Sequence, residues 1–192
     1  MTVFKMTAYP KEVEVPNKRT FIIRPMRAED DGALLDFFLR IPEDERFYLK
    51  EDVTSPGVIR QWVENLNYSR ALPLLAFVGD RIVADGTLHR RRAGATKHRG
   101  EIRVVVDPEF RNMGVGTELM RELIDIARDS DLERITLELV AQEQESALLT
   151  AEALGFVRLA TVPNYYRDAN GKPHDMLMME LPLGKWQEWW DF

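Results

Sequence analysis

The feature that most constrains this chain is segment 104–120, where three valines lead through two glycines into a helical pattern. The valine run is typical of a buried strand, and Asp107-Pro108 ends it. Gly114 and Gly116 then precede apolar residues at helical spacing. A strand–turn–helix junction of this kind presents backbone N–H groups at the positive end of a helix dipole. We therefore predict an anion-binding turn in the middle of the chain.

Other phosphate-binding loops fit this segment less well. A Walker loop requires Lys and then Ser or Thr after its last glycine, whereas Thr117-Glu118 follows here. A dinucleotide-binding fingerprint requires three glycines early in a βαβ unit, and this turn has two and lies mid-chain. A tight connection that binds nothing is the remaining alternative.

The rest of the chain alternates between strand and helix patterns. β-Branched and alternating runs predict strands over 20–24, 72–78, 81–89, 101–106, 135–140, 156–166 and 175–181. Apolar spacing predicts helices over 28–38, 55–66, 119–127 and 144–154. Segment 42–52 is expected to be a loop or a short helix. This order indicates an α/β or α+β fold built on a mixed sheet.

Composition excludes several classes of protein. The chain has no cysteine, so disulfides, thiolate zinc sites and cysteine nucleophiles are excluded, and its three histidines lack metal-ligand spacing. A net charge of −6 argues against nucleic-acid binding. No signal peptide or long apolar run is visible, so we expect a cytoplasmic protein with no membrane partner.

The length of 192 residues suits one domain with short extensions. We expect an N-terminal arm over 1–19, a single domain over 20–181, and an aromatic tail over 182–192. The tail contains Trp186, Trp189 and Trp190, which we expect to cover apolar surface.

The motif Arg111-x-x-Gly114-x-Gly116 resembles the acetyl-CoA signature of the GNAT family, the Gcn5-related N-acetyltransferases. The preceding Val106-Asp-Pro108, the later Ala153-Leu-Gly-Phe156 and the closing run 175–181 resemble the family's flanking patterns. So does Ile23-Arg24-Pro25 followed by Asp30 and an apolar helix. The resemblance covers about residues 20–181 and implies a mixed, mostly antiparallel sheet of six to seven strands. Helices should flank both faces, and two central strands should splay apart.

The resemblance also implies acetyl-CoA as cofactor and names the residues that would bind it. The pantetheine arm would pair with the strand at Val104, Val105 and Val106. The pyrophosphate would lie on the turn formed by Arg111, Asn112, Met113, Gly114, Val115, Gly116 and Thr117. Gln144 stands where the family often has an asparagine, and we include it in the cofactor site.

Direct transfer to an amine requires a base for the ammonium and an acid for the leaving thiolate. The family's usual tyrosine acid is absent, because Ala151 occupies its position. Tyr166, next to Tyr165, is the replacement candidate, and Glu101 is the candidate base. Asp85 and His89 are alternatives on the neighbouring strand.

The acceptor is predicted to be a primary amine, on a small molecule or on a protein lysine. The basic run 90–92 with Lys97 and Arg99 could hold the cofactor 3′-phosphate or an acidic substrate group, or could be a solvated loop. The sequence leaves the oligomeric state open, and a homodimer is one of the assemblies that we consider. Two other functions remain: a module that binds acyl-CoA without turnover, and an interaction domain that uses the aromatic tail.

Overall fold

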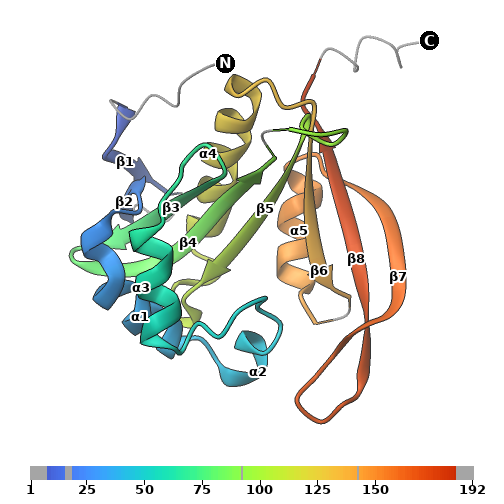
Figure 1. Cartoon of the computed structure of the whole chain (residues 1–192), viewed down its shortest axis with the longest axis horizontal. Helices are drawn as coiled ribbons and strands as arrows, with labels where there is room; N and C mark the ends of the chain where they lie inside the picture. The colour runs from blue at the N-terminus through green and yellow to red at the C-terminus, as the bar shows by residue number, and fades with distance from the viewer. Residues whose placement is uncertain (1–7, 16–18, 92, 142, 185–192) are drawn as a thin grey trace.

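A computed structural model of the chain describes residues 8–15, 19–91, 93–141 and 143–184, and contains one eight-stranded sheet (Figure 1). The strand order is β1-β2-β3-β4-β5-β6-β8-β7. All neighbouring strands pair antiparallel except β5 and β6, which are parallel. The predicted fold class, a mixed and mostly antiparallel sheet with helices, is confirmed.

The strands are β1 (Lys11–Glu14), β2 (Thr20–Pro25), β3 (Ala71–Val78), β4 (Arg81–Arg90), β5 (Arg99–Val106), β6 (Arg134–Val140), β7 (Val157–Arg167) and β8 (Pro173–Pro182). The α-helices are α1 (Asp31–Arg40), α2 (Glu43–Arg46), α3 (Pro56–Glu64), α4 (Val115–Asp129) and α5 (Glu145–Ala153). Two short 3-10 turns, η2 (Ala28–Asp30) and η3 (Pro108–Phe110), precede α1 and α4. None of the helices in the described part of the chain has the length and apolar content of a membrane span.

The sheet has one strand more than the six to seven that we expected. The additional strand is β1, which lies in the segment predicted to be an arm and pairs with β2 from Lys11 opposite Ile23 to Glu14 opposite Thr20. This strand has four residues, of which only Val13 is buried. Its alternation of apolar and polar residues is therefore too short to predict a strand. The tryptophans of the predicted tail lie outside the described residues.

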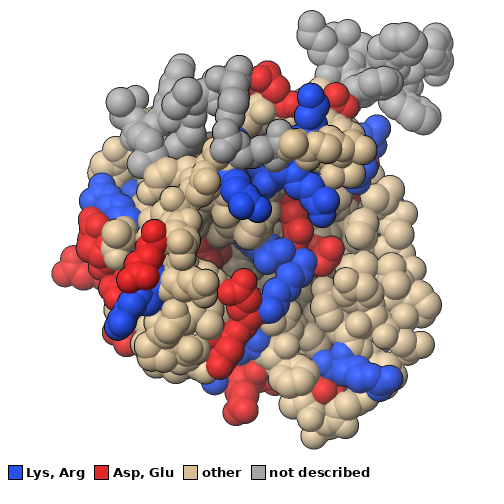
Figure 2. Space-filling model, viewed as in Figure 1, with Lys and Arg blue, Asp and Glu red and all other residues tan. Residues whose placement is uncertain are grey.

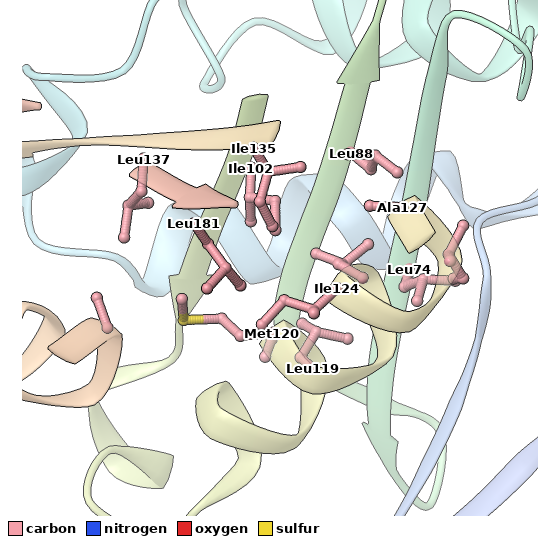
Figure 3. Packing of buried hydrophobic residues seen from close by; sticks show 14 of the residues in the cluster. Leu74, Leu88, Ile102, Leu119, Met120, Ile124, Ala127, Ile135, Leu137 and Leu181 are labelled. Atoms are coloured by element: carbon pink, nitrogen blue, oxygen red, sulfur yellow. The ribbon is translucent and has the colours of Figure 1, made fainter. Parts of the chain in front are cut away.

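The two faces of the sheet carry separate hydrophobic clusters. On one face α4 packs against β4 and β5 through Leu119, Leu123 and Ala127 (Figure 3). On the other face α1 and α3 bury Phe37, Phe38 and other apolar residues against β3 and β4. Helices therefore cover both faces, and the central strands are held firmly between them.

The strands β5 and β6 pair only at their first residues. The ladder joins Arg99 to Arg134, Gly100 to Ile135 and Glu101 to Thr136. Beyond Glu101 the two strands diverge (Figure 1), while β4 continues to pair with β5 as far as Val106. One backbone edge of β5 therefore opens onto a gap between the two halves of the sheet.

Candidate active site

The predicted anion-binding turn joins the open end of β5 to α4. Asn112 has φ 58° and Gly114 has φ 91°, so the chain passes twice through the left-handed region. Glycine adopts this conformation at little cost, and Gly114 is the N-cap of α4. The first bond of the helix runs from the Glu118 N–H to the Gly114 carbonyl at 3.0 Å.

The first turn of α4 offers its backbone donors to the gap side of the molecule. The N–H groups of Val115, Gly116 and Thr117 precede that first helical bond and therefore have no acceptor inside the helix. No side chain caps them at Gly114. A Cβ on Gly116 would lie 3.1 Å from Val106 Cγ2, so glycine lets the helix start close to β5. Donors and the helix dipole together favour a bound anion here.

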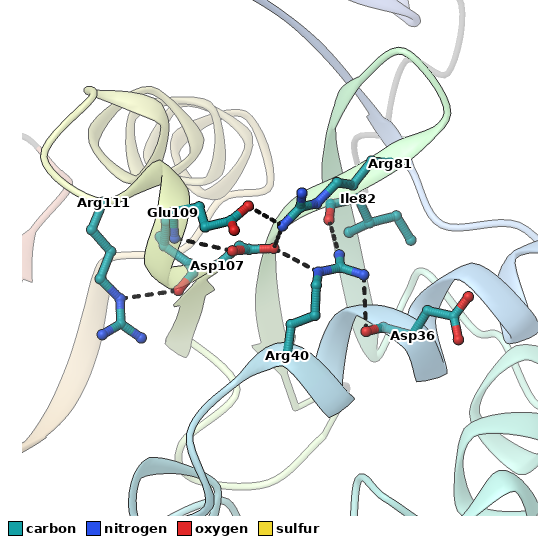
Figure 4. A network of polar contacts seen from close by, with 8 residues as sticks. Asp36, Arg40, Arg81, Ile82, Asp107, Glu109 and Arg111 are labelled. Atoms are coloured by element: carbon teal, nitrogen blue, oxygen red, sulfur yellow. Dashed lines mark hydrogen bonds and ion pairs between the residues drawn. The ribbon is translucent and has the colours of Figure 1, made fainter.

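Asp107 fixes the strand end from which the turn departs (Figure 4). Its buried carboxylate accepts from Arg40 Nε at 2.7 Å, Arg81 Nη2 at 2.9 Å and the Glu109 N–H at 3.1 Å. Burial opposes ionisation, but the hydrogen bonds from Arg40 and Arg81 outweigh it and lower the pKa of Asp107. Helix α1, strand β4 and the turn are thereby joined at one charged group.

The Arg111 side chain is directed away from the first turn of α4. Its Nε lies 3.2 Å from the Val106 carbonyl, and its two terminal nitrogens bind Glu45 of α2 at 2.8 and 2.6 Å. Anion binding at this turn therefore depends on backbone donors. Sequence reasoning missed Arg19, whose Nη1 lies 2.8 Å from Met113 Sδ in the turn. No motif marks Arg19, since only the antiparallel order of β2 to β5 brings it there.

The remaining predicted cofactor residues lie around the gap. Val104, Val105 and Val106 are only partly buried at the unpaired edge of β5. Asn112 meets the first turn of α5, where Ser146 Oγ lies 3.3 Å from Asn112 Oδ1. Gln144 Oε1 accepts from the Val140 N–H at 2.9 Å and closes the β6–α5 connection.

Glu101 lies at the apex of the gap, where β5 and β6 part. Its Oε1 binds Arg103 Nε at 2.7 Å and Lys50 Nζ at 3.0 Å. Burial raises the pKa of Glu101, but the bonds from Arg103 and Lys50 exceed this effect, and the pKa is lowered. Glu101 is therefore ionised and held by two cations.

Glu138 of β6 was missed by sequence reasoning and faces the same apex. Its buried Oε2 lies 3.3 Å from Lys50 Nζ, without hydrogen-bond geometry to any described group. The alternation of strand residues after Thr136, the β6 partner of Glu101, was the signal that could have found it. Lys50 thus lies between two carboxylates on neighbouring strands.

Tyr166 stands across the gap on β7. Its ring packs edge-on against Tyr48 at 5.8 Å and against Tyr165 at 4.9 Å between centroids. Burial, followed by the charge of Glu138, raises the pKa of Tyr166 to about 12. The phenol is therefore protonated at neutral pH, and the structure brings it and Glu101 to one region.

Asp85 and His89 project from the same face of β4 toward this region. Asp85 lies opposite Val105, and His89 lies opposite Glu101. Burial raises the pKa of Asp85 to about 7, and burial with the charge of Arg103 lowers the pKa of His89 to about 4. Acidic and basic side chains alternate down the middle of this face in Figure 2.

The sequence profile of the acetyltransferase (GNAT) family matches residues 27–156, from before α1 to the end of α5. This range includes the turn, the diverging strands and Glu101. The chain belongs to the GNAT family.

Relatives of this GNAT chain carry related names. A [ribosomal protein bS18]-alanine N-acetyltransferase from Escherichia coli strain K12 is 31% identical over 80 residues, 42% of this chain and 53% of the relative. Human N-alpha-acetyltransferase 30 is 30% identical over 161 residues, 81% of this chain and 40% of the relative. The chain spans about half or less of the length of these curated relatives.

A solved structure shows the same fold. The yncA protein of Salmonella typhimurium, solved with its cofactor acetyl-CoA, aligns with a TM-score of 0.73 at 18% identity. The alignment covers 86% of this chain and 95% of the yncA chain.

Three further observations on the GNAT chain bear on its chemistry. Ala151, at the position of the family's tyrosine, is fully buried in α5. Among the described residues no group of three His, Cys, Asp or Glu side chains could hold a metal ion. The basic loop after β4 lies at the end of β5 opposite the turn.

Proposed function

We propose that this chain is an N-acetyltransferase that moves an acetyl group from acetyl-CoA directly to a primary amine. The observation that carries the proposal is the gap between β5 and β6, which opens next to the uncapped N-terminus of α4. An extended thioester with a pyrophosphate group matches both parts: an unpaired strand edge and a cluster of backbone donors.

The chain's residues fit acetyl-CoA in two places. The N–H groups of Val115, Gly116 and Thr117 would hold the pyrophosphate, with Arg111, Asn112, Met113 and Gly114 shaping the turn. The open edge at Val104, Val105 and Val106 would pair with the pantetheine amides, and Gln144 would border the arm from α5. Bound acetyl-CoA supplies the acetyl thioester, which the protein exposes to the amine at the apex of the gap.

The acceptor that we favour is the α-amino group of a protein. One named relative is an alanine N-acetyltransferase and the other is an N-alpha-acetyltransferase, which favours this amine over a lysine or a small-molecule amine. At the apex the acceptor ammonium would compete with Lys50 for the carboxylates of Glu101 and Glu138. A cytoplasmic location and a homodimer stay predictions.

Acid and base roles fall to groups around the apex. The acceptor ammonium must lose a proton before its nitrogen forms the new C–N bond, and the proton would pass to Glu101, directly or through water. As the C–S bond breaks, the leaving sulfur takes a proton, which Tyr166 would donate because its phenol stays protonated. The nitrogen loses its second proton as the amide forms, and this proton would restore the Tyr166 phenol through water. Positioning of the amine supplies most of the acceleration.

The experiment that tests the cofactor site is calorimetric titration with acetyl-CoA. Gly114→Val should abolish binding, because a β-branched residue is strained at φ 91° and would displace the donors. Gly94→Val is the matched control: Gly94 has φ 92°, with no atom within 4 Å of a Cβ built on it. Equal affinity in the two variants would refute the assignment of the turn.

The acceptor is tested by measuring CoA release with three panels of amines. Peptides with free N-termini should react, whereas N-terminally blocked peptides with internal lysine and small amines should react at least about tenfold more slowly. Preference for blocked lysine peptides or small amines would overturn the α-amino acceptor and leave the acetyltransferase proposal intact.

A non-catalytic acyl-CoA-binding module is the second candidate. The observation that favours it is Ala151, which is fully buried where the family has its tyrosine and can supply no proton. Acetyl-CoA binding without CoA release on any amine panel would select this candidate.

A further inference from the structure

One cavity in the described part of the chain lies away from the proposed active site. It measures about 690 Å³ and is lined by Asn67, Arg70, Arg90, Arg91 and Ala93, where β3 begins and β4 ends. We call it the arginine pocket. Basic side chains gather at the upper centre of the face in Figure 2, near the upper ends of β4 and β5.

Most arginines elsewhere in the described part of the chain form ion pairs with carboxylates. Pairs form between Arg24 and Asp30, Arg40 and Asp107, Arg103 and Glu101, Arg111 and Glu45, Arg134 and Glu180, and Arg158 and Glu152. Within the described residues, by contrast, no ion pair involves Arg70, Arg90 or Arg91. An acidic chain of net charge −6 thus leaves three neighbouring cations uncompensated.

Arg90 is held rigidly by neutral groups. Its Nη1 donates to Ser130 Oγ at 2.9 Å and its Nη2 donates to the Tyr68 carbonyl. Its buried Nε has no hydrogen-bond partner among the described residues. Burial lowers the pKa of Arg90, because the half-buried charge has no counter-ion to compensate for its desolvation.

A purely structural role accounts for only part of this arrangement. Ser130 Oγ also donates to the Ile126 carbonyl at 2.6 Å, so Arg90 supports the C-terminal end of α4, where a cation is favourable. That role leaves Arg70 and Arg91 unexplained. Both are exposed beside Arg90 and line the same cavity, so mutual repulsion is expected unless an anion binds.

The arginine pocket is separate from the proposed cofactor turn. Arg90 pairs with Gly100 near the start of β5, whereas the turn follows Val106 at its end. At about 3.3 Å per residue, the two sites are about 20 Å apart. A pyrophosphate on the turn therefore does not occupy the pocket.

We propose that the arginine pocket is a second anion site that binds a phosphate ester of a small molecule. Guanidinium groups match phosphate oxygens with paired N–H donors. Three cations match a ligand that carries two or more negative charges better than they match a ligand with a single carboxylate. The volume lies within the usual range for small-molecule pockets, so a group larger than phosphate itself can enter.

The test is calorimetric titration of the full chain with inorganic pyrophosphate at low salt, after the cofactor turn has been saturated with acetyl-CoA. Arg70→Ala/Arg91→Ala should weaken binding at least about tenfold, since both residues are exposed and their loss should not disturb folding. Arg60→Ala/Arg158→Ala is the matched control, because it removes two exposed cations outside the pocket. A nucleoside diphosphate should compete with pyrophosphate in the unsubstituted chain.

Two results would overturn the proposal. One is equal pyrophosphate affinity in the pocket variant and the control variant, or no saturable binding in the unsubstituted chain. The other is tighter binding of a single-stranded oligonucleotide that the pocket variant loses, which would assign the pocket to nucleic acid. If acetyl-CoA itself fails to bind, the same titration in Gly114→Val still reports on the pocket alone, so the two proposals fail separately.

Discussion

Two carboxylates around the gap, Glu101 and Asp85, have pKa values shifted in opposite directions. Burial acts on both Glu101 and Asp85, but Glu101 has Arg103 and Lys50 as partners, and Asp85 has only a weak contact with Thr87 at 3.5 Å. The pKa of Glu101 is therefore lowered, while that of Asp85 rises to about 7. Neighbouring cations, which the sequence does not place, decide which carboxylate is charged.

The raised pKa of Asp85 predicts a pH dependence of stability. The folded state holds the Asp85 proton more tightly than the unfolded state, so its contribution is complete below about pH 4 and is lost as the pH rises through about 7. By linkage the loss is at most about 4 kcal/mol. Asp85→Asn should therefore gain stability relative to the unsubstituted chain at pH 8 but not at pH 4, as measured by urea unfolding.

The exposed Asp36→Asn is the control for this comparison, and it should shift stability equally at both pH values. An Asp85→Asn variant whose difference from the unsubstituted chain does not change with pH would contradict the prediction. His89, with its lowered pKa, contributes in the opposite direction in both chains and cancels in the difference.

The proposed acid and base predict separate kinetic effects. Glu101→Gln and Tyr166→Phe should each lower kcat by roughly a hundredfold and leave the Kd of acetyl-CoA nearly unchanged. Tyr165→Phe is the matched control, since Tyr165 is exposed next to Tyr166. If Glu138→Gln loses activity while Glu101→Gln keeps it, the base is Glu138.

At the scale of elements, one glycine sets how closely α4 lies on the sheet. A Cβ on Gly86 of β4 would lie 2.8 Å from Leu119 Cγ and Cδ2, and Leu119 is fully buried. This close approach places the first turn of α4 beside the end of β5. The glycine in β4 therefore positions donors that lie far from it in sequence.

Gly86→Ala should destabilise the fold by about 1–3 kcal/mol, because the added methyl group displaces a packed side chain. Gly32→Ala in α1 meets no atom within 4 Å and should be neutral or stabilising by up to about 1 kcal/mol. Chemical denaturation of both variants measures the difference. Equal free energies of unfolding for Gly86→Ala and Gly32→Ala would mean that α4 can shift on the sheet to accommodate the added methyl group.

At the scale of the whole molecule, the sheet is two units joined at a short ladder. Strands β1 to β5 form one unit and β6 to β8 the other, and the ladder between β5 and β6 has three residue pairs. A ligand in the gap would bind both units and substitute for the missing pairs. Binding at a hundredfold excess over Kd should raise stability by about 2.7 kcal/mol.

Hydrogen exchange should report this bridging. Acetyl-CoA should slow exchange at Val104–Val106 and at the first turn of α4, because those amides gain acceptors. The exposed edge strand β7 should show little change near Val157, which serves as the internal control. Protection at β7 without protection at β5 would place the ligand elsewhere.

Local patterns in the sequence were enough to predict the order of most strands and helices, the glycine turn before α4 and the family. Glycines at a strand–helix junction, alternating strands and the 3.6-residue period are read within short windows. It did not determine strand β1, whose single buried residue carries too little pattern. Nor did it find Arg19, Glu138 or Lys50, which are brought to the site by strand order and, for Lys50, by the loop between α2 and α3.

The charge states and the separation of the two proposed anion sites follow from the tertiary structure. Arg111 is directed to Glu45 by the position of α2, and the arginine pocket is remote from the turn because β5 runs between them. Desolvation and ion pairing depend on distances in space, and residues far apart in sequence set those distances. The local sequence therefore sets the backbone conformation of the turn, and the packing of the sheet determines which side chains surround it.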